Sequence, residues 1–176
     1  MGDISPLLDQ NRAWVKRRFE KCDDILNRQV FLEDGKKEGL LVYVEVAVSN
    51  LMREEQVIGL ADVQPLSTYE EAESALLAGN GILFLAGDDQ VYKISSKGYP
   101  GLGVSKAESE KVMRGSKEGF TESEKLNVAL IRKRLRDPRM KVEEQQIGTR
   151  SHTMTALVYM EDLVYPDLLD TIKERM

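Results

Sequence analysis

Cysteine and aromatic side chains are scarce in this chain of 176 residues. The single cysteine, Cys22, excludes an intramolecular disulfide and any zinc site built from several cysteines. Aromatic residues make up only 6%, so a core must depend on leucine, valine, isoleucine and methionine. Hydrophobic residues still reach 41% and charged residues 31%, which is typical of a soluble globular protein. We therefore expect an ordinary folded protein in a reducing compartment.

Long hydrophobic runs are also missing. The most apolar stretch, residues 40–51, is interrupted by Glu45 and is shorter than the roughly 20 residues that a membrane span needs. No basic segment followed by an apolar one opens the chain, so we expect no secretory signal. The glycine-rich stretch 98–103 lacks the Lys-Ser/Thr pair of a phosphate-binding loop, and the acidic pairs lack EF-hand spacing. The sequence thus predicts no cofactor and no metal site.

Charge is unevenly distributed along the chain. The segment from Lys111 to Lys141 has ten Lys or Arg and four Asp or Glu, a net +6 in a chain of net −5, so the remainder carries −11. Such a basic segment is either an anion-facing surface or one half of an internal charge match.

Hydrophobic periodicity predicts an α/β or α+β protein. Helices are expected over residues 7–25, 50–60, 67–78, 121–136 and 166–175, the fourth opening with a Thr121–Glu124 capping box. Strands are expected over 30–32, 39–46, 82–86, 91–94, 140–147 and 153–160, most of them paired through turns. Residues 95–103 are expected to form a loop.

A short internal repeat supports two related halves. Leu41–Val48 matches Leu157–Val164 at five of eight positions with an offset of 116 residues. We expect two small subdomains, residues 1–64 and 65–176, each with a mixed β-sheet, flanking helices and a cleft between them. Helix 67–78 and the hairpin after it can belong to either half and are assigned to the second. The alternative is that Leu-Val-Tyr is simply typical of a buried strand.

Nucleophilic catalysis has little support in the sequence. The only histidine, His152, follows Ser151 in a predicted turn, and an exposed loop histidine is the simpler interpretation. Cys22 is expected on the buried side of the first helix as a small core residue. A small hydrolase using Ser151 or His152 remains one alternative function.

The stripe from Arg132 to Lys141 suggests a second alternative, a nucleic-acid-binding module. Cations in the last turn of a helix also suit the helix dipole, which explains part of the stripe without any partner. The acidic pI of about 5.1 and the lack of aromatic residues among these charges argue against it, so no nucleic acid is expected as a partner.

The second half of the chain carries a long and specific pattern: Arg114-Gly115-x-x-Glu118-Gly119-Phe120-x-Glu122, then Asn127-x-Ala129-Leu130-x-Arg132-x-Arg134-x-Arg136, and further on Gly148-x-Arg150-Ser151 and Val158-Tyr159-Met160-Glu161. This pattern resembles the GerA-type A subunits of spore germinant receptors and the related stage V sporulation proteins. Residues 1–65 resemble the family more loosely.

The resemblance implies a non-enzymatic, two-subdomain soluble region at the amino terminus of a longer membrane protein. That parent protein would lie in the spore inner membrane, with this region on the cytoplasmic side, facing the spore core. Its role would be receptor assembly, germinant sensing or signal relay. The implied partners are other germinant receptor subunits, the protein's own membrane region and a small nutrient germinant.

Eight residues of the pattern are candidates for a ligand site or for the contact between the subdomains. An anion or carboxylate would suit Arg114 and the helix start near Thr121, whereas internal ion pairs would fix the two halves together. The candidates are Arg114, Glu118, Glu122, Asn127, Arg132, Arg134, Arg136 and Arg150.

Overall fold

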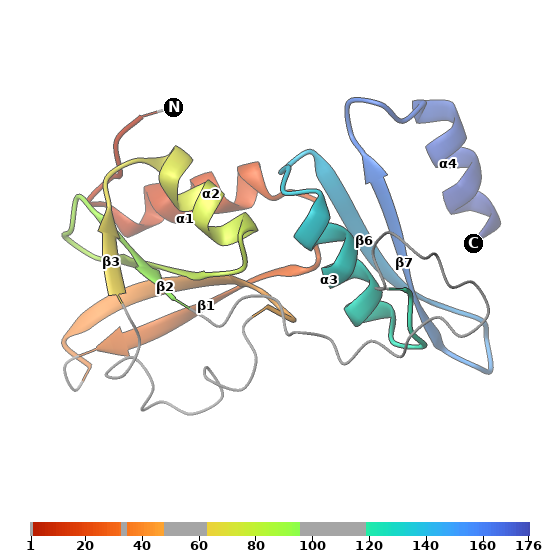
Figure 1. Ribbon diagram of the computed structural model, residues 1–176, viewed down its shortest axis with the longest axis horizontal. Coiled ribbons are helices and arrows are strands. Elements are labelled where there is room, and N and C mark those ends of the chain that lie inside the picture. The colour runs from red at the N-terminus through yellow and green to blue at the C-terminus, as the bar shows by residue number, and fades with distance from the viewer. Residues whose placement is uncertain (1, 33–34, 48–62, 96–118) are drawn as a thin grey trace, which may run out of the picture.

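The computed structural model describes residues 2–32, 35–47, 63–95 and 119–176. Helices and strands are mixed along the chain, and the α+β class is confirmed (Figure 1). The elements are α1 (Leu8–Arg18), β1 (Ile25–Leu32), β2 (Lys37–Val44), β3 (Val63–Leu66), α2 (Tyr69–Leu77), β4 (Gly81–Leu85), β5 (Val91–Ile94), α3 (Glu124–Arg134), β6 (Met140–Ile147), β7 (Thr153–Met160) and α4 (Pro166–Arg175).

The larger part of the molecule is a five-stranded sheet in the order β1-β2-β4-β5-β3. Both α1 and α2 pack on one face of this sheet, where their apolar side chains meet Leu40, Val42 and Phe84 in one core (Figure 1). Helix α2 begins at Thr68 with a complete capping box to Glu71. We call residues 2–32, 35–47 and 63–95 the first lobe.

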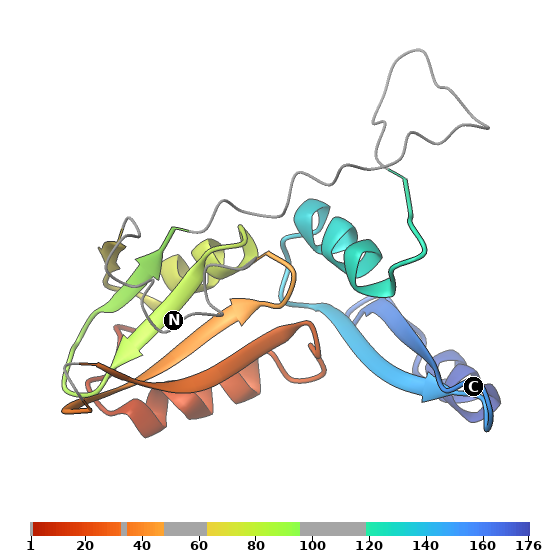
Figure 2. The ribbon, with the colours of Figure 1, turned by 90° about the horizontal axis from the view of Figure 1, so that it is seen from below.

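The smaller part is the antiparallel hairpin β6–β7 with one helix on each face (Figures 1 and 2). Helix α3 packs through Val128 on Met140 and Val142, which form a small separate core. Helix α4 has no buried residue and is joined to the hairpin by the ion pair from Lys173 to Glu143. We call residues 119–176 the second lobe.

The lobe boundary lies elsewhere than expected. The expected border between residues 64 and 65 falls inside β3, and β4 pairs directly with β2, so residues 65–94 join the first lobe. The physical reason is that β2 is apolar on both faces and therefore takes a central position that needs a strand on each edge. All strand pairs in the two described sheets are antiparallel, whereas mixed sheets were expected.

Two local predictions in the helices are wrong. The first helix ends at Arg18, not near residue 25, and Lys21 then adopts a left-handed φ of 57° that turns the chain into β1. Cys22 is therefore buried in a connecting loop and not on a helix. The expected capping box at Thr121 is also absent, because Ser123 caps α3 by accepting from the Leu126 amide.

Some expectations fall on the parts of the chain that the structure does not describe. These are the short helix over 50–60, most of the 95–103 loop and the segment holding Arg114 and Glu118. Among the described helices, none combines the length and the hydropathy that crossing a bilayer requires.

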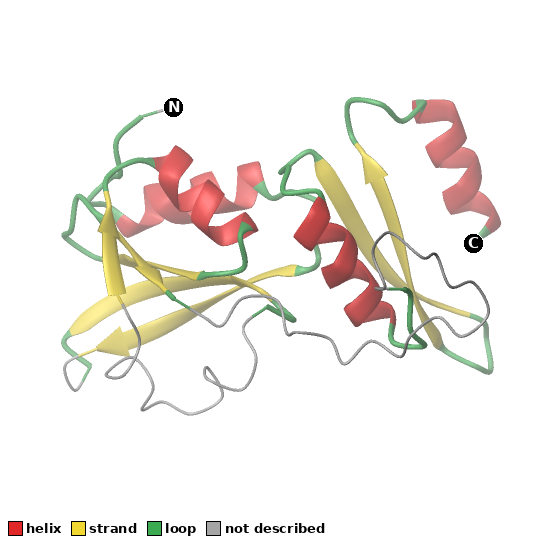
Figure 3. Ribbon diagram, in the orientation of Figure 1, coloured by secondary structure: helices red, strands yellow, loops and turns green. Residues whose placement is uncertain are grey.

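The structure extends the internal repeat well beyond the strand that predicted it. Units α1–β1–β2 and α3–β6–β7 have the same order and nearly equal lengths, with starting residues 115 or 116 positions apart (Figure 3). Their non-helical hydrogen bonds match as well. In the first unit the Asn11 amide donates to Ser5 O and the Glu45 N–H donates to Asp24 O; the equivalents are Asn127 to Thr121 O and Glu161 to Arg139 O.

Candidate functional site at the junction of the two lobes

One buried ion pair connects the lobes. Arg132, in the last turns of α3, is 0% exposed and makes two hydrogen bonds of 2.8 Å with the carboxylate of Asp24, which precedes β1. Its Nη1 also donates to the carbonyl oxygens of Asp137 and Met140. Burial alone would lower the pKa of Arg132, but the bond to Asp24 outweighs it and the pKa is raised. Both carboxylate oxygens of Asp24 thus accept from the Arg132 guanidinium at a buried position, and such hydrogen bonding is what a buried ion pair requires.

Main-chain pairing adds a second connection at the same place. The loop after α1 lies along β6: Asp23 N–H donates to Val142 O at 2.9 Å, and Val142 N–H donates to Lys21 O at 2.8 Å. The Asp23 carboxylate then accepts from the Glu144 amide at 2.8 Å. Segment 21–23 thus acts as a short extra strand on the edge of the second lobe.

Side chains of α3 close the junction on one side. Ala129 is buried in the core of the first lobe although it belongs to the second. Lys125 forms an ion pair with Glu45, which directly follows β2. The remaining cavity between α3 and this corner of the first lobe has a volume of about 10 Å³, too small for a ligand. The α3 side of the junction is therefore tightly packed.

Cys22 lies in the middle of these contacts. Its Sγ is 3.6 Å from Met140 O, and burial raises the pKa of the thiol despite the nearby cations of Arg132 and Lys141. A buried thiol of raised pKa is a poor nucleophile and a poor metal ligand. The described residues also contain no group of three His, Cys, Asp or Glu side chains that could hold a metal ion.

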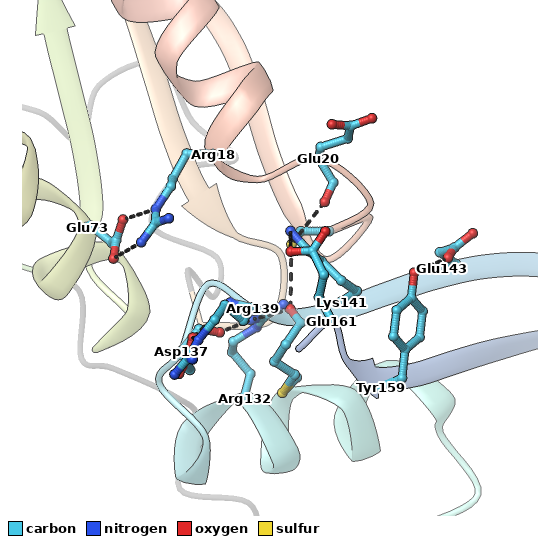
Figure 4. Close-up of polar contacts among 12 residues, drawn as sticks. Arg18, Glu20, Glu73, Arg132, Asp137, Arg139, Lys141, Glu143, Tyr159 and Glu161 are labelled. Carbon is cyan, nitrogen blue, oxygen red and sulfur yellow. Dashed lines mark hydrogen bonds and ion pairs between the residues drawn. The ribbon is translucent and has the colours of Figure 1, made fainter. Parts of the chain in front are cut away.

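The opposite side of the junction is open. A cavity of about 500 Å³ lies there, with the stacked rings of Trp14 and Tyr69 on its first-lobe side. Its charged lining comes from both lobes: Arg17, Arg18, Glu20, Arg139, Lys141 and Glu161. Three of the cations already have acidic partners, since Arg18 pairs with Glu73, Arg139 with Asp137 and Asp162, and Lys141 with Glu161 (Figure 4).

The structure separates the remaining predicted residues. Asn127 binds both the amide and the carbonyl of Thr121 and so shapes the start of α3. Arg136 is exposed, and its Nε donates to Lys133 O. Glu122, Arg134 and Arg150 are exposed and lie apart from the buried pair. Of the six candidates that lie within the described residues, only Arg132 takes part in the junction between the lobes.

The basic stripe does not form a continuous surface. Arg132 and Lys141 are buried, and Arg139 is held by two carboxylates. Asp137, one of the two, has its pKa lowered to about 2 by its bonds with Arg139. Three of the six cations of the stripe, Arg132, Arg139 and Lys141, therefore already have acidic partners within the molecule, which weakens the case for a phosphate-binding surface. His152 is exposed in the β6–β7 turn at a φ of 47°, as the simpler interpretation predicted.

Comparison with known proteins shows the family of this chain. The sequence model described as "Bacillus/Clostridium GerA spore germination protein" matches residues 13–176. The chain belongs to the GerA family. The expected resemblance to GerA-type subunits is thereby confirmed, including its first half.

Several members of the GerA family from Bacillus subtilis (strain 168) resemble the chain along most of its length. Stage V sporulation protein AF is 29% identical over 86% of the chain and 29% of its own length, and spore germination protein KA is 24% identical over 98% and 36%. The chain therefore spans about a third of the length of these relatives.

A solved structure has the same fold. The crystal structure of the N-terminal domain of the A subunit of the Bacillus megaterium spore germinant receptor GerK3 superposes with a TM-score of 0.74 at 20% identity. The match covers 99% of this chain but 72% of the GerK3 domain, so that domain holds further polypeptide.

Sequence reasoning does not identify the individual acidic partners of Arg132 and Lys125. From the sequence, the pair Asp23-Asp24 is either solvated or a partner of the basic segment, and Glu45 only interrupts an apolar stretch. The structure pairs Asp24 with Arg132 and Glu45 with Lys125. One pattern could have indicated the first of these. Asp24 directly precedes β1, and Arg139 directly precedes β6 at the equivalent position of the repeat. Each of the two hairpins is therefore preceded by a charged residue.

Proposed function

We propose that this chain is the amino-terminal module of an A-type subunit of a spore germinant receptor, and that it is not an enzyme. It would lie on the cytoplasmic side of the spore inner membrane, attached to a membrane region like the one that the resemblance implies. Two finer roles follow: contact with other receptor subunits, and relay of a signal through the junction between the lobes.

The observation that supports relay is the asymmetry of the junction. One side is held by the buried Arg132–Asp24 pair and the packed α3, while the other side opens into a cavity of about 500 Å³. A contact that is rigid on one side and open on the other acts as a hinge, because the lobes can move about the packed side without exposing much apolar surface. An event at either lobe would then change the width of the cavity.

The test uses spores in which the parent subunit carries substitutions at the junction. Arg132→Ala leaves the buried Asp24 without a partner, and the double variant Arg132→Met/Asp24→Leu replaces the pair with apolar side chains of similar volume. Lys16→Ala, at the equivalent position of the repeat unit, is the control because Lys16 is exposed. Subunit amounts in the spore membrane and germination rates after nutrient addition are measured together.

Relay predicts that the double variant is present at wild-type amount but germinates several-fold more slowly. A double variant that is lost together with its partner subunits supports assembly in place of relay. Wild-type amount with wild-type germination would contradict both roles.

A nutrient ligand is a second candidate function, favoured by the open cavity alone. Its aromatic wall of Trp14 and Tyr69 and its cations from both lobes suit a small molecule with a carboxylate or a sugar-like face. Titration with amino acids, sugars and nucleosides, followed by NMR at Trp14 and Lys141, tests it. Saturable shifts at both residues support ligand binding, and unchanged spectra across the panel contradict it.

A further inference from the structure

The two repeat units differ in what lies beside their second strand. In the first unit, β2 pairs with β1 on one edge and with β4 on the other. In the second unit, β7 pairs with β6, and no other described strand lies on its outer edge. The position equivalent to β4 is therefore unfilled among the described residues.

Hydrogen bonding shows which groups of β7 face that edge. In β2, Glu38 O accepts from Ala86 N–H, so the main-chain groups of alternate residues, including Leu40 and Val42, point towards β4. Just after β7 the Glu161 N–H donates to Arg139 O. Counting back by two residues along the strand, the main-chain groups of Tyr159 and Leu157 therefore point towards β6. The main-chain groups of Ala156 and Val158, which are equivalent to Leu40 and Val42, point outward.

Burial differs in the same way. Leu40, Leu41 and Val42 are fully buried, whereas their equivalents Ala156, Leu157 and Val158 are only partly buried. The segments that precede α1 and α3 differ in burial in the same direction. Ile4 is 4% exposed and its amide donates to Ser67 O just before α2, whereas Phe120, at the equivalent position, is 69% exposed. Within the part of the chain that the structure describes, the second unit thus lacks cover at the places where α2 and β4 cover the first.

We propose that the outer edge of β7, together with Phe120, receives a helix followed by an apolar antiparallel strand, arranged like α2 and β4 on the first unit. The occupant is the additional polypeptide of the subunit itself, since the GerK3 domain holds more polypeptide than this chain covers. This proposal rests on one part of the proposed function, namely that the chain is part of a longer subunit.

The repeat also limits the register. At Gly39 in β2 a Cβ atom would lie 3.0 Å from Phe84 O of β4, so the strands approach closely there. The equivalent residue of β7 is Thr155, which has a side chain. The added strand therefore pairs opposite Ala156–Val158 and diverges before Thr155. An occupant with apolar residues on both faces fits, because β4 is buried at all five positions.

Hydrogen exchange of the 176-residue chain and of the full-length subunit in detergent tests the proposal. We expect the amides of Ala156 and Val158 to exchange at least 100-fold more slowly in the full-length subunit, and Leu157, which faces β6, to be protected in both forms. Equal exchange of Ala156 and Val158 in both forms would overturn the proposal. Protection that appears only with partner subunits, or only at high concentration of the short chain, would overturn the assignment of the occupant.

Two variants separate this result from a general loss of folding. Phe120→Ser changes an exposed side chain in the short chain and should leave its melting temperature unchanged, but should restore at least tenfold faster exchange at Ala156 in the full-length subunit. Ala156→Pro removes an amide that β6 does not use and should make the Val158 amide exchange at least tenfold faster in the full-length subunit. Unchanged protection in the full-length Phe120→Ser subunit would contradict the proposal. Germination is not the readout, so failure of the relay mechanism leaves this test intact.

Discussion

The units α1–β1–β2 and α3–β6–β7 have the same local architecture in different surroundings. Each has an asparagine that ties the start of its helix to the preceding segment, and each ends its hairpin with the same main-chain bond. The first unit is completed by α2 and three more strands, whereas the second has a core of three buried residues and α4, which buries none. Local hydrogen bonds therefore define the unit, and what packs around it determines how much apolar surface it buries.

Substitutions at equivalent positions of the two units should differ most in their effect on the free energy of unfolding in the last turns of α1 and α3. Arg132→Ala should lower the free energy of unfolding by about 3–5 kcal/mol, because Asp24 stays buried without its partner. Lys16→Ala, the same position in α1, should change it by less than about 0.5 kcal/mol, since Lys16 is exposed. Urea unfolding of both variants measures the difference. Equal losses would mean that the junction pair contributes no more than an exposed side chain.

The second strands should respond unequally to the loss of a leucine side chain. Leu41→Ala should cost about 2–5 kcal/mol, because Leu41 is 0% exposed between two strands. Leu157→Ala should cost about 1 kcal/mol, since Leu157 is only partly buried. Thermal and urea unfolding of the 176-residue chain provide the values. A cost at Leu157 that matches Leu41 would show that β7 is already fully covered.

The two asparagines should differ less. Asn11 is fully buried and accepts a hydrogen bond of 2.6 Å from the Tyr69 hydroxyl, so Asn11→Ala should cost about 2 kcal/mol. Asn127 is half-buried, and Asn127→Ala should cost about 1 kcal/mol. Tyr69→Phe is the control: it should add no further loss in the Asn11→Ala background, because the hydroxyl has already lost its Asn11 partner there. Independent, additive losses would contradict a shared hydrogen bond.

The smallest expected effect is a loss of stability in acid. The bonds of Asp137 with Arg139 lower its pKa from 3.8 to about 2, so the stabilisation is present above pH 4 and is lost as the pH falls through 2. Because Arg139 is half-exposed and solvent screens the pair, we expect only a small loss in the free energy of unfolding between pH 5 and pH 2. Asp137→Asn should remove that part of the pH dependence, and urea unfolding at each pH measures it. An unchanged slope would show that other carboxylates carry the acid sensitivity.

Much of the fold was predictable from the sequence because hydrophobic periods are local. The turn at 148–151 between two strand-like runs, Pro166 at the start of α4 and the Leu-Val-Tyr repeat all indicated the correct elements. The place of β4 in the sheet was not predictable, because β4 pairs with β2, which is separated from it in the chain by β3 and α2. The end of α1 was missed because Trp14, Phe19 and Cys22 keep helical spacing beyond the helix, while the left-handed turn at Lys21 carries no glycine.

The candidate site was predictable only in its basic half. Arg132 stood out in a dense run of arginines, but nothing in that run separates a buried guanidinium from exposed ones such as Arg134 and Arg136. Its partner Asp24 lies 108 residues away, and pairing over that distance is set by how the lobes pack. The cavity and its aromatic wall likewise arise from residues of both lobes.

Native-state hydrogen exchange of the 176-residue chain tests the comparison of the two units most directly. We predict that Leu41 and Val42 in β2 both exchange only through global unfolding, whereas in β7 Leu157 is protected and its neighbour Val158 exchanges at least 100-fold faster. Equal protection of Val42 and Val158, with a single opening free energy for both lobes, would contradict the account.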